Sequence, residues 1–438
     1  MLVNKLAVVV FLVMRFLRYI FITIATCLLC NIAVAQNKPY RTASLDSRIH
    51  SLKIESGNGF MLSPVIRLTT DDVVNISFDL FEEDHQELSY SIIHCNANWQ
   101  PSSLSSIEYI DGFDIQEVYD WALSFNTFQN YVNYKITLPN DDIQFKVSGN
   151  YVVVVYPQNQ RERPLLYACF RVSEEVVRVS CSASSRTDKG YADNYQQVSF
   201  RINRNDYNII NPASDLKIYV TQNNRLDNMA YVQTPQYFNN REIVYEHNNN
   251  LIFDAGNEYR RFEIVSTQYR GMGVEELTHF DPYYHAILEQ DYPRMNRSYT
   301  YDETQHGRYL IRETDFEEDS DTQADYFIVH FSLDVNELLL PEGDIYIDGE
   351  LSENRFSENN RMLRNPQSGV FEKIMLLKQG SYNYQYLFVP KGESIGKASI
   401  IEGNKYETLN EYNVNVYHRV PGERYDRLIG TGKCISSN

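Results

Sequence analysis

The sequence predicts an all-β protein made of tandem β-sandwich domains. Apolar and polar residues alternate with period two in many short segments, which places one face of each strand inward and the other in water. The chain is also rich in residues that favour strands, with 34 Tyr and 22 Phe among 438 residues. No segment shows sustained helical periodicity, and turn residues separate the short strands, so sandwiches are favoured.

Individual strands can be assigned from this pattern. The run 151–156 is apolar on both faces and is therefore predicted to be covered on both sides. The best short helix covers 114–122, after the turn at Asp111-Gly112. Alternating strands are predicted at 74–80, 88–94, 198–202, 216–220, 327–333 and 412–416.

The N-terminus has the parts of a secretory signal peptide. A chain that starts at Met14 opens on two arginines, continues through a short apolar run and reaches the small-residue site Ala33-Val34-Ala35. A membrane anchor would need about 20 unbroken apolar residues, and the two arginines divide the only candidate. Residues 1–35 are therefore predicted to be a cleaved leader, with Met14 as an alternative start.

Composition divides the rest of the chain into three predicted domains. A chain of this length exceeds one small core, and about three domains are expected. The acidic run 315–321 has the composition of a linker. The predicted boundaries are 36–173 for the first sandwich, 174–313 for the second, 314–323 for the acidic linker and 324–438 for the third.

Charge excludes some classes of partner. The formal net charge is −18, and the predicted leader contains three cations and no acid. The exported body is therefore more acidic still, and it should repel nucleic acid and anionic membrane surfaces.

Four cysteines lie outside the leader, namely Cys95, Cys169, Cys181 and Cys434. These four form no C-x-x-C pair, so structural zinc and thioredoxin-type redox chemistry have no support. An exported location permits one or two disulfide bridges, and buried thiols are the other interpretation. Cys169 and Cys181 are the nearest pair and are predicted as a disulfide.

Motifs that suggest catalysis or ligand binding do not have the context that their chemistry needs. Gly392-Glu393-Ser394-Ile395-Gly396 has the form of a serine-hydrolase elbow, but strands on both sides predict a hairpin tip. Gly271-Met272-Gly273 lacks the third glycine of a dinucleotide loop. No catalytic or cofactor-binding residue is therefore predicted.

Metal binding has weak support. His279 and His285 are six residues apart, so they lack the spacing of a helical zinc pair, and they are predicted as turn or packing residues. The acidic run 315–321 could hold Ca²⁺, but it lacks the glycine and the terminal glutamate of an EF-hand loop. No metal site is predicted.

The third domain resembles early-set immunoglobulin-like sandwiches, a group that includes glycogen-binding modules. The likeness rests on the segments 343–349 (GDIYIDG) and 379–386 (QGSYNYQY) and concerns the fold only. Sugar platforms usually present exposed Trp faces, yet both tryptophans, Trp99 and Trp121, lie in the first domain. This distribution disfavours carbohydrate binding by the third domain.

The chain as a whole resembles the plug family of the bacterial type IX secretion system. The likeness runs in order through nearly the whole mature chain. The segments that carry it are 91–99 (SIIHCNANW), 108–113 (EYIDGF), 124–127 (SFNT), 134–140 (YKITLPN), 148–151 (SGNY), 256–262 (GNEYRRF), 281–285 (DPYYH) and 421–428 (PGERYDRL).

This resemblance implies a periplasmic protein without catalytic residues or cofactors. Its expected partner is the SprA/Sov-type outer-membrane β-barrel translocon, whose inner mouth it would close until a folded cargo protein arrives. No nucleic acid, membrane insertion or small-molecule substrate is expected. The alternative is an exported carbohydrate-binding or polysaccharide-processing sandwich protein, and a generic periplasmic scaffold is a third hypothesis.

Overall fold

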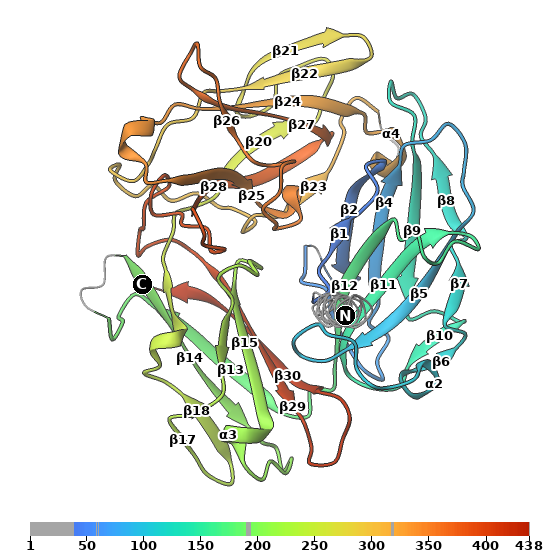
Figure 1. Ribbon diagram of the computed structural model, residues 1–438, viewed down its shortest axis with the longest axis vertical. Coiled ribbons are helices and arrows are strands. Elements are labelled where there is room, and N and C mark those ends of the chain that lie inside the picture. The colour runs from blue at the N-terminus through green and yellow to red at the C-terminus, as the bar shows by residue number, and fades with distance from the viewer. Residues whose placement is uncertain (1–38, 58, 60, 190–193, 317–318, 438) are drawn as a thin grey trace, which may run out of the picture. The chain divides into compact units, whose positions relative to one another are not determined.

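The computed structural model describes residues 39–437 apart from 58, 60, 190–193 and 317–318. Residues Arg41–Asn438 form one compact unit. The predicted leader, residues 1–35, lies outside the described residues. Nearly all regular structure in the unit is strand (Figure 1), so the all-β prediction is confirmed.

The first sandwich packs two sheets over one core. Its elements are β1 (Ala43–Ser44), β2 (Ile49–Ser56), β3 (Val65–Arg67), β4 (Val74–Leu80), β5 (Leu88–Cys95), α2 (Ser106–Tyr109), β6 (Ile110–Gly112), β7 (Ile115–Glu117), β8 (Asp120–Leu123), β9 (Val132–Leu138), β10 (Ile143–Phe145), β11 (Gly149–Pro157) and β12 (Leu166–Ser173). One sheet has the order β1-β12-β11-β5-β7, and the other has the order β2-β4-β9-β8.

Burial follows the predicted alternation in this sandwich. Val74, Ile76 and Phe78 of β4 have no exposed surface, because their face of the sheet closes the core. Every residue of β11 is buried, as predicted for a strand covered on both faces. The outer cover comes partly from a later part of the chain, where the Tyr417 hydroxyl donates to Asn150 at 2.6 Å.

The second sandwich is one nine-stranded sheet whose two halves share a core. Its elements are β13 (Arg178–Ser184), β14 (Tyr195–Asn203), α3 (Pro212–Asp215), β15 (Leu216–Gln222), β16 (Ala230–Val232), β17 (Tyr237–Phe238), β18 (Glu242–Tyr245), η1 (Asn249–Leu251), β19 (Ile252–Asp254), β29 (Glu411–His418) and β30 (Arg427–Ser437). The strand order is β16-β15-β29-β30-β13-β14-β18-β17, with β19 also on β14. Phe200 and Tyr245 from one half pack with Val220 and Val414 from the other.

The third sandwich has a four-stranded and a five-stranded sheet. Its elements are β20 (Arg260–Ile264), β21 (Val274–Phe280), β22 (Tyr283–Leu288), β23 (Tyr309–Ile311), α4 (Ser320–Gln323), β24 (Tyr326–Leu333), η2 (Glu337–Leu339), β25 (Gly343–Asp348), η3 (Glu350–Ser352), β26 (Leu363–Arg364), β27 (Phe371–Lys378) and β28 (Gly380–Pro390). β28 is the centre of the first sheet, since it pairs with β20, β23 and β25. The second sheet has the order β21-β22-β24-β27-β26.

Strand pairing departs from the predicted domain boundaries in two places. β20 to β23 lie inside the predicted second domain, 174–313, but they pair with strands of the third sandwich. β29 and β30 lie inside the predicted domain 324–438, but they pair with β15 and β13. The third sandwich is therefore inserted between two halves of the second (Figure 1).

The predicted acidic linker 314–323 is part of the fold. Asp315 accepts hydrogen bonds from the backbone and hydroxyl of Thr267, at 2.6 and 2.8 Å. Asp319 caps α4 by accepting from the Asp321 amide. These carboxylates are engaged in turns and caps, because a short polar side chain there satisfies backbone donors that would otherwise lack partners.

A buried ion pair joins the first sandwich to the third. Lys378 at the end of β27 lies 2.6 Å from Asp79 in β4, and their side chains are 2 % and 0 % exposed. Tyr326 and Asn133 each donate a further hydrogen bond of 2.7 Å to Asp79. Because a buried carboxylate without partners is costly, these two sandwiches are held in one arrangement.

Similar contacts form the other two junctions. Between the second and third sandwiches, Arg308 lies 2.7 Å from Glu411 of β29, and both side chains are nearly fully buried. Between the first and second, Arg427 of β30 lies 2.6 Å from Glu174. The backbone amide of Ala97 also donates to the buried Asp426, at 3.1 Å. Each pair of sandwiches is thus tied by charge as well as by apolar packing.

Replacement of Lys378 by Met should destabilise the protein strongly. The substitution leaves the Asp79 carboxylate buried without its cation, and breaking a buried ion pair in this way costs about 3 to 5 kcal/mol. Unfolding by urea measures the loss. The matched control is Lys391→Met, which removes the exposed pair with Glu342 and should cost less than about 1 kcal/mol. Equal effects of the two substitutions would contradict the role given to the buried pair.

Stability should fall in acid because of Glu411. Burial by itself would raise the pKa of this carboxyl, but Arg308 and Lys433 outweigh it and lower the pKa from 4.5 to about 2. The folded pKa lies below the unfolded value, so ionisation of Glu411 contributes about 3 kcal/mol. That contribution is complete above about pH 5 and is lost as the pH falls toward 2.

Glu411→Gln should therefore lower the unfolding free energy at neutral pH and flatten its decline in acid. Urea unfolding at several pH values between neutral and acid provides the measurement. Glu393→Gln, at an exposed pair with Lys397, is the matched control and should keep the wild-type slope. A Glu411→Gln slope as steep as the wild type would refute this assignment.

Candidate docking surface

One short segment of the first sandwich exposes many large apolar side chains. Among the described residues 26 large apolar side chains are exposed, and eight of them lie between residues 107 and 128. Phe113 is 82 % exposed, and Ile107 and Tyr119 are each 73 % exposed. We call this segment the apolar edge; its members are Ile107, Phe113, Ile115, Tyr119, Trp121, Leu123, Phe125 and Phe128.

The apolar edge contains the terminal strand of each sheet of the first sandwich. Among the described strands, β7 pairs with β5 alone and β8 pairs with β9 alone. Only Val118 and Tyr119 separate β7 from β8, and Figure 1 shows both strands on the outer side of the sandwich. A terminal strand leaves backbone N–H and C=O groups on its open side, where a strand from a partner can add.

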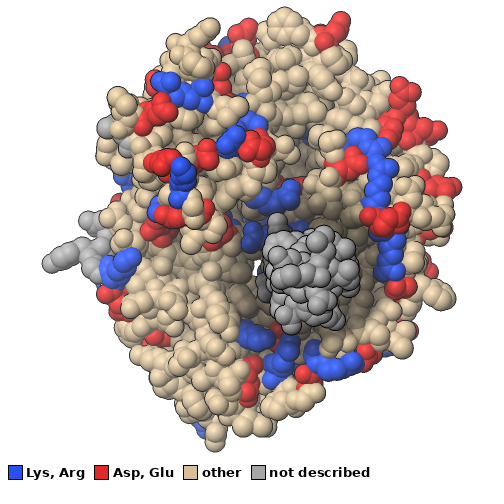
Figure 2. Space-filling model, in the orientation of Figure 1, with Lys and Arg blue, Asp and Glu red and all other residues tan. Residues whose placement is uncertain are grey.

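Acidic groups accompany the apolar side chains. Residues 107–128 contain five acids and neither Lys nor Arg. Two of the acids are paired, Glu108 with Arg424 and Asp114 with Arg161 at 3.5 Å. Figure 2 shows acidic side chains on the right-hand side, where Figure 1 has β8, with basic side chains beside them. The surface is thus both apolar and negative, which favours a partner with apolar and basic side chains.

Contacts at the far end of the apolar edge hold it in place. The indole of Trp121 stacks on the His85 ring, with centres 4.2 Å apart and planes 6° from parallel. The backbone amide of Phe128 donates to Asp325 of the third sandwich at 2.7 Å, and the Phe128 ring lies 4.7 Å from that of His279. The edge is therefore positioned before any partner arrives, which reduces the entropy lost on binding.

The helix predicted over 114–122 is wrong, and the correction concerns this same segment. Ile115, Val118 and Trp121 have helical spacing, but β5 and β9 offer backbone partners on opposite sides, and the segment forms β7 and β8 instead. Within residues 114–122 only Val118 is buried, at the point where the chain passes from one sheet to the other. Three residues of the apolar edge, Ile115, Tyr119 and Trp121, lie within the range that was predicted as a helix.

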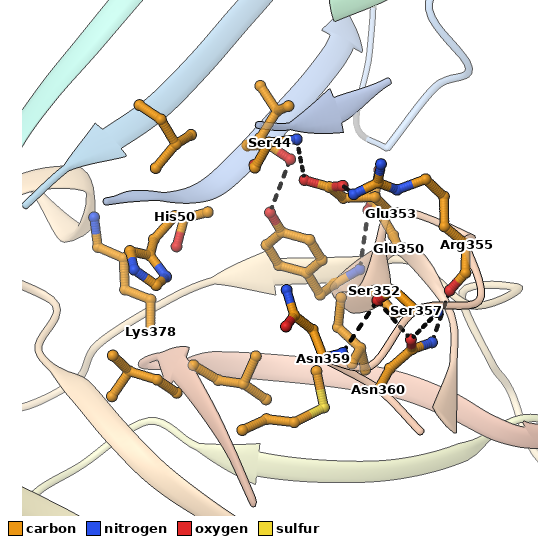
Figure 3. Close-up of a pocket in the computed structure, with 18 of the residues that line it drawn as sticks. Ser44, His50, Glu350, Ser352, Glu353, Arg355, Ser357, Asn359, Asn360 and Lys378 are labelled. Atoms are coloured by element: carbon orange, nitrogen blue, oxygen red, sulfur yellow. Dashed lines mark hydrogen bonds and ion pairs between the residues drawn. The ribbon is translucent and has the colours of Figure 1, made fainter. Parts of the chain in front are cut away.

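A separate hollow of about 520 Å³ lies between the first and third sandwiches (Figure 3). Its polar atoms bond to one another: the Ser44 amide donates to Glu353 at 2.7 Å, and Asn360 donates to the Arg355 carbonyl at 2.7 Å. Burial lowers the pKa of His50, so this ring is neutral near pH 7. We interpret the hollow as part of the junction, since its groups already hold the two sandwiches together.

The cysteines take positions that differ from the prediction. The structure holds Cys95, Cys169, Cys181 and Cys434 in the reduced state. Cys169 pairs with Val152 in the first sandwich, whereas Cys181 pairs with Phe200 in the second. The predicted Cys169–Cys181 bridge would join strands of two different sheets and is not present. The thiol that influences the pKa of Cys181 is that of Cys434, on the parallel neighbouring strand.

The other predicted positions have structural surroundings. Gly392–Gly396 follows β28 in a turn that returns to a bridge between Lys397 and Phe388, in agreement with the predicted hairpin tip. Nδ1 of His285 lies 2.9 Å from Nε2 of His330 on the neighbouring strand. In the part of the chain that the structure describes, no three His, Cys, Asp or Glu residues gather as metal ligands would.

The tyrosines of the early-set likeness are buried. Tyr382, Tyr384 and Tyr386 of β28 are 2 %, 4 % and 0 % exposed, since they fill the core of the third sandwich. Rings in the core do not form a platform on which a sugar can stack, so these residues give the carbohydrate-binding alternative no support.

Comparison with known families identifies the first sandwich. Residues 49–174 match the family profile described as Type 9 secretion system plug protein 1st domain. The chain belongs to the type IX secretion plug family. The matched range contains the apolar edge and ends at the boundary between the first and second sandwiches. A plug-family chain has a role related to type IX secretion in the cell envelope, and its family domain points to a structural role.

Solved structures extend the likeness beyond the first sandwich. The crystal structure of a hypothetical protein from Parabacteroides merdae is 44 % identical, with a TM-score of 0.89, over 91 % of this plug-family chain and 100 % of that one. An alkylpurine DNA glycosylase of Pseudomonas fluorescens bound to DNA with an abasic site analog is 16 % identical over 28 % of this chain and 30 % of that one. Its TM-score is 0.18, which is too low to indicate a shared fold. No curated protein matches the chain.

In the residues that the structure describes, none of the helices has the length and apolar character that crossing a bilayer requires.

Proposed function

We propose that this plug-family protein binds the periplasmic mouth of the SprA/Sov-type outer-membrane translocon and closes it until a folded cargo protein arrives. The observation that carries the proposal is the apolar edge, which lies in the domain that the family profile matches. The protein acts by bulk and fit, without turnover, a cofactor or a small-molecule substrate. Export to the periplasm is part of the proposal and is supported by the leader-like residues 1–35.

The joined sandwiches suit the closure of a wide pore. The lumen of a β-barrel widens with its number of strands, so a pore for folded proteins is too wide for a short loop to seal. A compact chain of this length has a radius of gyration of roughly 21 Å and measures about 50 Å across. The buried ion pairs of Lys378 and Arg308, together with the partly exposed pair of Arg427, supply the stiffness that a rigid plug needs.

The chemistry of the apolar edge defines the part of the translocon that it would meet. Aromatic side chains are common anchors at the centres of interfaces, and Phe113, Tyr119 and Trp121 are available for that role. Five acids in the same segment favour Lys and Arg around the apolar contacts. The proposed contact on the barrel is thus a basic segment with apolar side chains at its inner rim, which can add to β7 or β8 as a strand.

Substitutions in the apolar edge should weaken binding to the translocon. Phe113→Asp with Tyr119→Asp buries new charge in the contact, and recovery of the barrel from detergent-solubilised outer membranes should fall by at least about tenfold. The matched control is Ile210→Asp with Phe238→Asp, two residues that are 73 % and 50 % exposed on the second sandwich. Mass spectrometry identifies and quantifies the barrel that co-elutes with each tagged protein.

The control pair should recover as much barrel as the wild type, and thermal unfolding should show that both variants remain folded. Equal recovery by the edge pair, the control pair and the wild type would overturn the assignment of the apolar edge. In that case the plug would contact the barrel through a different surface.

Deletion of the protein should make the outer membrane permeable to large antibiotics such as vancomycin. An unplugged translocon leaves a pore that passes folded proteins, and such a pore also passes a glycopeptide. Growth inhibition of the deletion strain provides the measurement, and the wild-type chain should restore resistance where the edge pair does not. If the deletion strain excludes vancomycin as well as its parent, the gating role is wrong. Micromolar binding on a glycan array would instead favour the carbohydrate-binding alternative.

A further inference from the structure

We infer that Cys181 and Cys434 form a disulfide that fastens the last strand of the chain to the first strand of the second sandwich. The two cysteines lie on β13 and β30, which are parallel neighbours in the nine-stranded sheet. Strand register, the close approach of the two strands and the accessibility of the two thiols all favour this bond.

The register of the two strands places the cysteines opposite each other. Ala183 pairs with Ser436, and Ser184 pairs with Ser437. Two residues earlier on each strand, the same alignment brings Cys181 opposite Cys434. The next pair along supports it, because Gly432 lies against Val179. Residues opposite each other in a parallel pair point to the same face of the sheet.

The strands approach closely at this place. A Cβ atom on Gly432 would lie 2.7 Å from Cγ1 of Val179, and one on Gly430 would lie 2.6 Å from Cγ2 of Val177. Neighbouring strands are about 4.8 Å apart, which is within the range of Cα separations that a disulfide spans. The two thiols are near enough for each to shift the pKa of the other.

The surroundings distinguish this pair from the other two thiols. Cys181 and Cys434 are half-buried, whereas Cys95 is fully buried and Cys169 is 9 % exposed. The hydrogen bond from Cys434 lowers the pKa of Cys181, and burial raises the pKa of Cys169 to about 12. The thiolate is the reactive form of cysteine, so the half-buried pair is more accessible to a disulfide donor than the two buried thiols.

Formation of the bond needs a disulfide donor, namely a disulfide-exchange enzyme or a small disulfide such as oxidised glutathione. The Cys181 thiolate attacks one donor sulfur, which forms a mixed disulfide and releases the other donor sulfur as a thiolate. The Cys434 thiol loses its proton to water and attacks Cys181, which releases the second donor thiolate. Two protein thiols are oxidised, and one donor disulfide is reduced to two thiols.

The bond would close the second sandwich around its insertion. β13 and β30 belong to the two separate chain segments, 178–254 and 411–437, that build this sandwich on either side of the third. A bond between them therefore encloses 252 intervening residues, numbers 182–433, and restricts the unfolded chain, which stabilises the folded one. It would also prevent β30 from detaching at the chain end.

Peptide mapping of the protein purified from its native envelope without reductant tests the inference. After alkylation in denaturant, trypsin should give the peptide 179–186 linked to the peptide 434–438, while Cys95 and Cys169 should be alkylated. Dithiothreitol should separate the linked peptides. Four alkylated thiols, or a link between Cys169 and Cys181, would overturn the inference.

Thermal unfolding supplies a second measurement. Dithiothreitol should lower the midpoint of the wild type and of Cys95→Ser by a few degrees, because both retain the bond. Cys434→Ser should unfold at a midpoint that does not respond to the reductant. If Cys434→Ser responded to dithiothreitol as the wild type does, the inference would be wrong. The peptide mapping uses the wild-type protein, so its result does not depend on how well a variant folds.

Discussion

The need to neutralise buried charge is the constraint on which the three-sandwich arrangement depends. Asp79 lies in a strand of the first sandwich and is fully buried, yet its cation, Lys378, comes from a strand 299 residues away in the sequence. Glu411 is likewise neutralised from another sandwich, by Arg308. A carboxylate buried without its cation costs several kcal/mol. The first sandwich therefore takes the cation for Asp79 from the third, and the second takes one of the two cations around Glu411 from the third, the other being its own Lys433. This sharing couples the folding of the three sandwiches.

Chain topology strengthens the same coupling. The second sandwich takes β15 from one segment and β29 from another, and the whole third sandwich lies between these segments in the sequence. The nine-stranded sheet is incomplete until β29 and β30 arrive, so it forms only when the inserted sandwich has brought its two ends together. Such non-local strand pairing makes folding slow, but it makes the folded unit resist bending at the places where separate domains usually flex.

The sequence predicted strands better than it predicted their partners. Alternation located β4, and the apolar run at 151–156 located β11 together with its burial on both faces. The alternation of apolar and polar residues shows which side of a strand is buried, but it does not show which strand lies beside it. The alternation at 412–416 therefore did not indicate that this strand pairs with β15. The apolar edge was missed for the same reason. Exposure of Trp121 depends on the absence of a further strand beyond β8, which is a property of the sheet rather than of its own residues.

An open, apolar strand edge raises the question of why two copies of the protein would not pair through it. Bare edges of this kind are sites of aggregation, and natural sheets protect them with charge. The five acids of residues 107–128 serve this purpose, since two of them are neutralised by arginines of the same chain and three are left to repel a second copy. The same three charges attract a basic segment. One set of side chains thus excludes self-association and favours a positive partner, so the edge combines strong apolar contacts with selectivity.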